Sequence, residues 1–441
     1  MFCGRDIPSG GLKQDMLHND VRLNIDDIMR ANGNPHDHVQ VEISKYFILD
    51  AIRSAFSKET RRIDSRVDGL GESLTIEMPK LEILPPEETY SVNLGPIYTG
   101  EGTIAGNYDV LRNIFLEQLS FDRESDFSER LIPVFGDQLT VSRMRSIMSE
   151  RREETSAYEG FKWLMPIPGF FHLKMNLLYS LGKSHRGDDD SSSNSYSTLS
   201  AHIQALHRKN IPPGKAPFHH MEELIIHSFK ARIVALFLLY IKERTKGRCD
   251  ISDMEQLSTY ITSLRLVEFS KAIESIYAAA FSKDIRDEAN SSNKGRGKES
   301  GADTCSAAKD EEFINHVRYL QEVETYWTLK YAIKHADVGL LQRVLPRCIL
   351  YFHGSGATNY ALEMLHLWRL LSTDACDPPL KRAILVNGLV NLRRQEDSWL
   401  EIDLHNEHLN LELKELLFAR RNGTFDVNTR FRNCILSCKY K

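Results

Sequence analysis

The sequence lacks the features that mark secreted and membrane-spanning proteins. Its seven cysteines are scattered, odd in number and without a CxxC pair, which fits a reducing compartment better than a disulfide framework. The first residues, MFCGRDIPSGGLKQD, contain neither a basic leader nor an apolar signal core. The longest apolar run, residues 233–241, is far shorter than the roughly 20 residues that cross a bilayer, and it predicts a buried helix. We therefore expect an intracellular protein without membrane contact, with nothing to separate nucleus from cytoplasm.

An excess of positive charge and the common nucleotide-binding loops are absent too. The formal net charge is −5 at pH 7, which argues against a surface that coats nucleic acid non-specifically. The glycine-rich stretch 95–106 has neither GxGxxG nor a Walker lysine, and the chain contains no GxSxG elbow and no kinase motif set. DNA is therefore a partner that the charge does not favour, a protein partner is left open, and no loop motif predicts a cofactor.

Two segments are almost without large apolar residues. They are RGDDDSSSNSYST at 186–198 and the 29-residue polar stretch at 284–312, and both are predicted to be disordered. The rest has the 41% hydrophobic and 27% charged content of an ordinary globular protein. The two segments divide the chain into a mixed α/β part at 1–185, a helical part at 199–283 and a helical C-terminal part at 313–441.

Hydrophobic periodicity predicts an α+β fold that is predominantly helical, with a small mixed α/β part at the N-terminal side. Residues 74–84 alternate as a strand does, and 131–135 form a short apolar strand. A polar helix follows at 141–152, and a second apolar stretch at 163–171 leads into a helix at 172–181. Further helices are predicted from apolar spacing at 221–243, 252–282, 312–335, 340–351, 360–371, 380–392 and 406–420.

Asp137 has the position in the sequence that best suggests an active site. The apolar run LIPVF is followed at once by Gly136 and Asp137. A carboxylate at the carboxyl end of a buried strand is where α/β folds place catalytic or metal-binding acids. The same residue fits a cap of the helix that begins near Val141, either directly or through Thr140. The spacing supports the two roles equally.

A metal site for phosphoryl transfer needs several converging carboxylates. Two-metal catalysis holds ions about 4 Å apart with such groups. Candidate partners of Asp137 are Glu101, Asp109, Glu363 and Glu407, but none has a diagnostic spacing from it. Each of them, taken alone, is more often a solvated charge on a helix face.

The histidines carry a weaker signal. His172 lies where an apolar stretch meets a helix, and a buried or capping histidine is the favoured interpretation there. His405 and His408 share a helical face, but HNEH is not the HExxH arrangement of metalloproteases.

Several segments together resemble a family of fungal proteins of unknown function that has distant animal relatives, occurs in many genomic copies and is regarded as transposon-derived. The segments occur in the same order and cover most of the chain outside the two polar segments. They are LTIEMPKLEILPP (74–86), GPIYTGEGTIAGNYDVL (95–111), RLIPVFGDQLTVSRMRS (130–146), WLMPIPGFFHLKMNLLY (163–179), LKYAIKHADVGLLQRVLP (329–346), FHGSGATNYALEMLHL (352–367) and LVNL with IDLHNEHLNLELK (389–414).

The resemblance implies a hypothesis about the site. The order of strand, Gly-Asp, helix, apolar strand and helix is similar to the middle of an RNase H-like transposase core. By that analogy Asp137 is the second catalytic acid and a ligand of Mg²⁺ or Mn²⁺, and Glu363 or, less favoured, Glu407 is the third. This is an analogy between folds and carries no chemistry of its own.

One departure from the family counts against activity. The family has a further N-terminal strand with an Asp-Asn pair that supplies the first acid, and this chain begins at a point past it. We therefore expect a truncated, catalytically inactive relative of a transposon-encoded protein. Two alternatives stay open: an active metal-dependent DNA nuclease or transposase fragment, and a helical protein-interaction module with 221–371 as its core.

Overall fold

The fold was analysed in a computed structural model of the chain. It describes residues 2–3, 5–18, 21–33, 37–65, 76–100, 102–187, 197–209, 211–212, 216–282, 284–285 and 304–418. Over these residues the protein is α+β and predominantly helical, as the periodicity predicts, with three sheets of two strands each.

The helices form most of the described chain. They are α1 (Ile25–Gly33), α2 (His38–Ala55), α3 (Ser57–Ser65), α4 (Ile104–Arg112), α5 (Gln138–Glu150), α6 (Phe170–Ser184), α7 (Leu199–Ala205), α8 (Phe218–Thr245), α9 (Met254–Ser263), α10 (Leu266–Ala280), α12 (Thr304–Lys334), α13 (Val338–Gly354), α14 (Thr358–Ser372), α15 (Pro378–Asn387) and α16 (Ile402–Phe418), with short turns at η1 (Gln14–Met16) and η2 (Asn113–Gln118). The strands are β1 (Phe2–Cys3), β2 (Ser91–Val92), β3 (Ile132–Gly136), β4 (Leu164–Pro168), β5 (Leu389–Asn391) and β6 (Trp399–Glu401).

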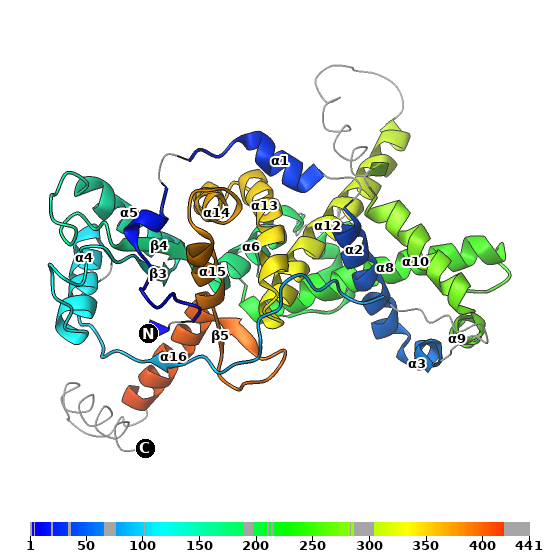
Figure 1. The fold of residues 1–441 in the computed structure, drawn as a ribbon. Helices are drawn as coiled ribbons and strands as arrows, with labels where there is room; N and C mark the ends of the chain where they lie inside the picture. The colour runs from blue at the N-terminus through cyan, green and yellow to red at the C-terminus, as the bar shows by residue number, and fades with distance from the viewer. Residues whose placement is uncertain are drawn as a thin grey trace.

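A parallel pair of strands forms the α/β element of the fold. Strands β3 and β4 run parallel, with Ile132 opposite Leu164 and Gly136 opposite Pro168, and α5 is the crossover between them. Because the strands are parallel, their carboxyl ends lie at one edge, where α5 and α6 both begin. Figure 1 places this unit, with α4, at one end of the molecule and α8, α9 and α10 at the other.

The two faces of this pair contact different cores. One face packs against an aromatic cluster centred on Phe115, Phe127 and Trp163. The rings of Phe115 and Trp163 meet edge to face, with their centroids 4.7 Å apart. The other face belongs to the main core, which runs through α2, α6, α8, α12, α13 and α14. Alternation along β4 produces this division, since Leu164 faces the aromatic cluster and Met165 and Ile167 face the main core.

Helix α8 contains the longest apolar run. Among the described residues it alone is long and apolar enough to cross a membrane, with 44% of its most apolar window buried inside the fold. Phe229, Ile233, Phe237 and Ile241, spaced by four residues, are fully buried against the main core. One face of α8 is therefore part of the main core.

The predicted strand at 74–84 is not part of a sheet. Residues 74–75 lie outside those described, and 76–84 form an extended segment with a single bridge to α13. Asp337, which is buried, accepts hydrogen bonds from the amides of Leu81 and Glu82, both at 2.9 Å, and caps α13 through Leu340 N. A side-chain carboxylate therefore satisfies amides that a neighbouring strand would otherwise have bonded.

Three other predictions differ in their bounds. Helix α12 begins at Thr304, inside the polar segment predicted to be disordered, since CSAAKDEE consists largely of residues that favour helix. The predicted helix at 252–282 is two helices, separated at Leu264 and Arg265. The predicted helix at 380–392 ends at Asn387, and residues 389–391 form β5 instead.

A buried arginine without a carboxylate partner joins α8 to α12. Arg232 is 5% exposed, donates to His316 Nδ1 and to the carbonyl of Ser197, both at 2.7 Å, and stacks 4.0 Å from the ring of Tyr319. Its Nε has no hydrogen-bond partner. Burial, and next the charge of Arg232, lower the pKa of His316 to about 4, with a smaller lowering from His202 and an opposing effect of Glu312.

This histidine makes stability depend on pH. Because the folded-state pKa of His316 lies below its ordinary value of 6.5, the unfolded chain binds more protons between about pH 6.5 and 4, and stability falls as pH drops through that range. We expect His316→Asn, which cannot titrate, to reduce that loss when urea unfolding midpoints at pH 7 and pH 5 are compared. His353→Gln, at an exposed position, is the control. An unchanged pH dependence in His316→Asn would contradict the assignment.

Candidate functional site

The carboxyl ends of β3 and β4 carry a cluster of polar side chains that interact with one another. Asp403, at the start of α16, accepts hydrogen bonds from the backbone amides of Phe171 at 3.1 Å and His172 at 3.0 Å. It also lies 3.0 Å from His172 Nδ1. Helix α6 has Gly169 at its N-cap and no capping side chain of its own, so a carboxylate from more than 200 positions away caps it.

Gly169 makes this close approach possible. A Cβ atom at this position would lie 2.3 Å from Asp403 Oδ2, closer than any real contact. The backbone of Gly169 also donates to the carbonyl of Gly136, which ties the end of β4 to the end of β3. A side chain at Gly169 would therefore displace the carboxylate that caps α6.

The surroundings make His172 more basic than a free histidine. Its pKa is raised above 6.5, first by the hydrogen bond to Asp403, then by the charges of Asp403, Asp137 and Glu407, with burial acting in the opposite direction. The side chain of His172 is 21% exposed and that of Asp403 is 8% exposed. The site is therefore a partly buried histidine among three carboxylates, on the solvent side of the strand ends.

A tyrosine from α14 completes the cluster. Asn176, one turn after His172 on α6, donates to the carbonyl of His172 at 2.8 Å and to the hydroxyl oxygen of Tyr360 at 2.7 Å. Burial, and next the charge of Asp137, raise the pKa of Tyr360 to about 12, so the hydroxyl keeps its proton at neutral pH. The Tyr360 hydroxyl hydrogen has no acceptor among the described contacts.

Asp137 is placed as the N-cap of α5. Its Oδ1 accepts from Thr140 N at 2.7 Å, the geometry of a capping side chain. The same carboxylate acts electrostatically on His172 and Tyr360. The capping interpretation of Asp137 therefore describes a contact in the structure, and the electrostatic effects show that the same carboxylate lies near His172 and Tyr360.

Glu363 has a different environment. It is 3% exposed on α14, and Arg145 of α5 approaches its Oε2 with Nε at 3.1 Å and with a terminal guanidinium nitrogen at 3.0 Å. Arg145 also reaches the carbonyl of Pro166 on β4, at 3.5 Å. The carboxylate of Glu363 thus joins α14 to the crossover helix and is neutralised by the guanidinium.

Glu407 lies one turn after Asp403 on α16 and is exposed. Its charge contributes to the raised pKa of His172. Asp109 is on α4, while Glu101 lies outside the described residues. Within the described chain, no group of three or more His, Cys, Asp and Glu side chains is arranged to hold a metal ion.

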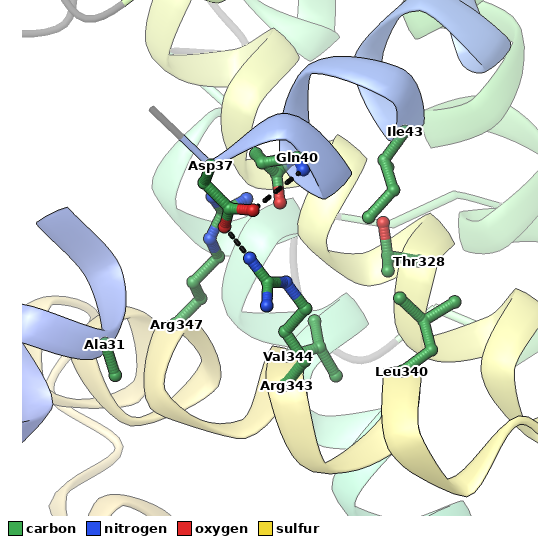
Figure 2. Close-up of a pocket in the computed structure, with 9 residues that line it drawn as sticks. All are labelled: Ala31, Asp37, Gln40, Ile43, Thr328, Leu340, Arg343, Val344 and Arg347. Carbon is green, nitrogen blue, oxygen red and sulfur yellow. Dashed lines mark hydrogen bonds and ion pairs between the residues drawn. The ribbon is translucent and has the colours of Figure 1, made fainter. Parts of the chain in front are cut away.

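A small pocket lies elsewhere, between α1, α2, α12 and α13 (Figure 2). Its interior has room for about one water molecule. Asp37 caps α2 through Gln40 N and forms an ion pair with Arg343, and Arg347 lies 3.5 Å from the buried carboxylate of Glu324. Each cation of the pocket faces an anion, so these residues form an ion-pair network that joins three helices.

The ion pair between Arg145 and Glu363 gives an asymmetric prediction. Arg145→Met leaves a carboxylate whose side chain is 4% exposed without its partner, and removing one partner of a buried pair costs about 3 kcal/mol or more. Glu363→Gln leaves a guanidinium that is 30% exposed and can be hydrated, with a loss of about 1 kcal/mol. Urea unfolding at pH 7 measures both changes. Equal losses would indicate that the carboxylate is solvated.

Sequence reasoning missed most of the cluster. His172 was interpreted as a buried or capping residue, and Asp403, Asn176 and Tyr360 were not singled out. One signal was present: a helix that begins after Pro168-Gly169 has no capping side chain of its own and needs a distant acceptor. Nothing in the sequence says that the acceptor is Asp403, since that follows from the packing of α16 on α6.

Comparisons with known proteins give a family and no activity. A model described as a family of unknown function, DUF6589, matches residues 21–436. No curated protein and no solved structure matches the chain. The matched range includes both strands of the parallel pair, the cluster around His172 and every helix from α1 to α16. The chain therefore belongs to the DUF6589 family of proteins of unknown function.

Proposed function

We propose that this chain is a transposon-derived protein that does not perform metal-dependent strand transfer or cleavage. The supporting observation is the ion pair between Glu363 and Arg145. In an RNase H-like site the third acid binds a divalent cation, and here a guanidinium takes the place of that cation beside Glu363. The unit of β3, α5 and β4 is, in this proposal, a remnant of an RNase H-like core whose acids stabilise helices.

The role of Asp137 fits the same proposal. One of its oxygens is used to cap α5, so the residue has a structural reason to be an acid whether or not a metal binds. Asparagine caps a helix about as well as aspartate does. A capping residue can therefore lose its charge without a large loss of stability. A metal ligand that loses its charge binds the cation much more weakly.

One observation favours a second function, a Mg²⁺- or Mn²⁺-dependent nuclease or transposase-like activity. The charges of Asp137 and Glu407 both raise the pKa of His172, so both carboxylates lie near this side chain. Under this alternative Asp137 and Glu407 are the acids that bind the cation, and Glu363 is excluded from it by Arg145.

Variants of Asp137 separate the two functions. If the residue is only a cap, Asp137→Ala lowers the stability by about 1 kcal/mol and Asp137→Asn is nearly neutral. Mn²⁺ then produces no thermal shift that depends on Asp137, and the protein does not nick supercoiled plasmid in Mg²⁺ or Mn²⁺. Glu255→Gln, an exposed acid on α9, is the control.

The alternative requires different results. Cation-dependent nicking that Asp137→Asn abolishes and Glu255→Gln preserves would refute the proposed loss of catalysis. Binding of DNA that weakens steeply with salt, without nicking, would agree with it and add a nucleic-acid partner.

A further inference from the structure

The imidazole of His172 is held in one orientation by a hydrogen bond at Nδ1, and its other nitrogen, Nε2, is left for a further interaction. Asp403 lies 3.0 Å from Nδ1, and the same carboxylate is fixed by two backbone amides. Nε2 has no hydrogen-bond partner among the described residues. A carboxylate that fixes Nδ1–H leaves Nε2 as the basic nitrogen, which is the arrangement of a general base.

A tyrosine hydroxyl is tied to the same turn of α6 as this histidine. Asn176 bonds both the carbonyl of His172 and the hydroxyl oxygen of Tyr360, so the two residues are tied to the same turn of α6. Because Asn176 donates to the tyrosine oxygen, the tyrosine's own hydrogen is available to an incoming acceptor. An acceptor that gains negative charge during a reaction would bind this hydrogen more strongly.

Charge restricts what can bind. Asp403 is paired with His172, whereas Asp137 and Glu407 have no cationic partner among the described contacts. Lys174, on the same helix, is already paired with Glu401. Two uncompensated carboxylates attract cations and repel the phosphates of nucleic acid. The site therefore selects a neutral or positively charged substrate.

We propose that His172 is the proton-transfer residue of a hydrolytic site for a small neutral or cationic carboxylic ester, with Asp403 as its positioning residue and Tyr360 as a hydrogen-bond donor. None of the residues of this cluster is a serine or cysteine nucleophile, so water attacks. Nε2 removes a proton from water as its oxygen bonds to the carbonyl carbon, and Tyr360 donates to the oxyanion. Nε2 then returns the proton to the leaving oxygen as the C–O bond breaks, which gives an acid and an alcohol.

This activity is independent of strand transfer and needs no metal ion, so it goes beyond the function proposed above. It also predicts a pH profile. The neutral base is present above the raised pKa of His172, so the rate rises with pH through a midpoint above 6.5. The charged groups that raise the midpoint act on His172 from two elements: Asp403 and Glu407 from α16, and Asp137 from the start of α5.

The test uses the full chain and three probes. These are acetylcholine, a cationic ester, 4-nitrophenyl acetate, a neutral ester, and bis(4-nitrophenyl) phosphate, an anionic diester. We expect hydrolysis of the first two and none of the third. His172→Gln should reduce the ester rates by about 100-fold or more. The control is His353→Gln, an exposed histidine outside the cluster, which should leave them unchanged.

Two further variants distinguish proton transfer from a purely structural role. Asp403→Asn keeps an acceptor for the α6 amides but removes the charge, so the midpoint of the pH profile should move to lower pH. Tyr360→Phe should lower kcat with little change of KM or of the midpoint. Thermal unfolding of each variant checks that it is folded. Ester rates equal to buffer alone, or equal rates in the native chain and in folded His172→Gln, would overturn the proposal.

Discussion

The capping of α6 by Asp403 is the constraint on which the arrangement of the strand edge depends. Three hydrogen bonds converge on this carboxylate, two from backbone amides and one from an imidazole. Through them α16 is fixed to the point where β4 ends. Gly169 has to be a glycine for the carboxylate to reach these amides, so the start of one helix determines the position of another far along the chain.

The same geometry explains why acids gather at this edge without any catalytic requirement. Helices α5 and α6 both begin there, and the amino-terminal end of a helix carries partial positive charge and unpaired amides. Asp137 accepts a hydrogen bond from an unpaired amide of α5, and Asp403 does the same for α6. His172, in the first turn of α6, lies among these carboxylates, which raise its pKa. A cluster that resembles an active site can thus arise from helix capping, and the catalysis proposed for it depends on Nε2 of His172, which has no partner among the described contacts.

Elements were predictable from the sequence wherever one face of a helix or strand is buried. The strands β3 and β4 and the helices that follow them came directly from apolar runs and periodicity. The segment at 76–84 alternates like a strand but has no neighbouring strand, because the buried carboxylate of Asp337 bonds its amides. Hydrophobic periodicity indicates which side chains face the core. It does not indicate which groups form hydrogen bonds with the backbone.

The candidate site was predictable only at Asp137, where strand and acid adjoin in sequence. His172 and Asp403 are 231 positions apart, and their contact depends on the packing of α16 against α6. Glu363 was favoured over Glu407 by analogy alone, and its ion pair was not predictable because its partner Arg145 is on another helix at a separation of 218 residues. Contacts of this range leave no local signal in a single sequence.

These long separations also order the events of synthesis. The strands β3 and β4 leave the ribosome early, yet Glu363 and Asp403, which neutralise Arg145 and cap α6, are made after a further 200 residues or so. At about 5–20 residues per second, the growing chain spends roughly 10 to 50 seconds with that helix end open and that guanidinium unpaired. The edge formed by β3 and β4 is therefore not completed until α14 and α16 have been made.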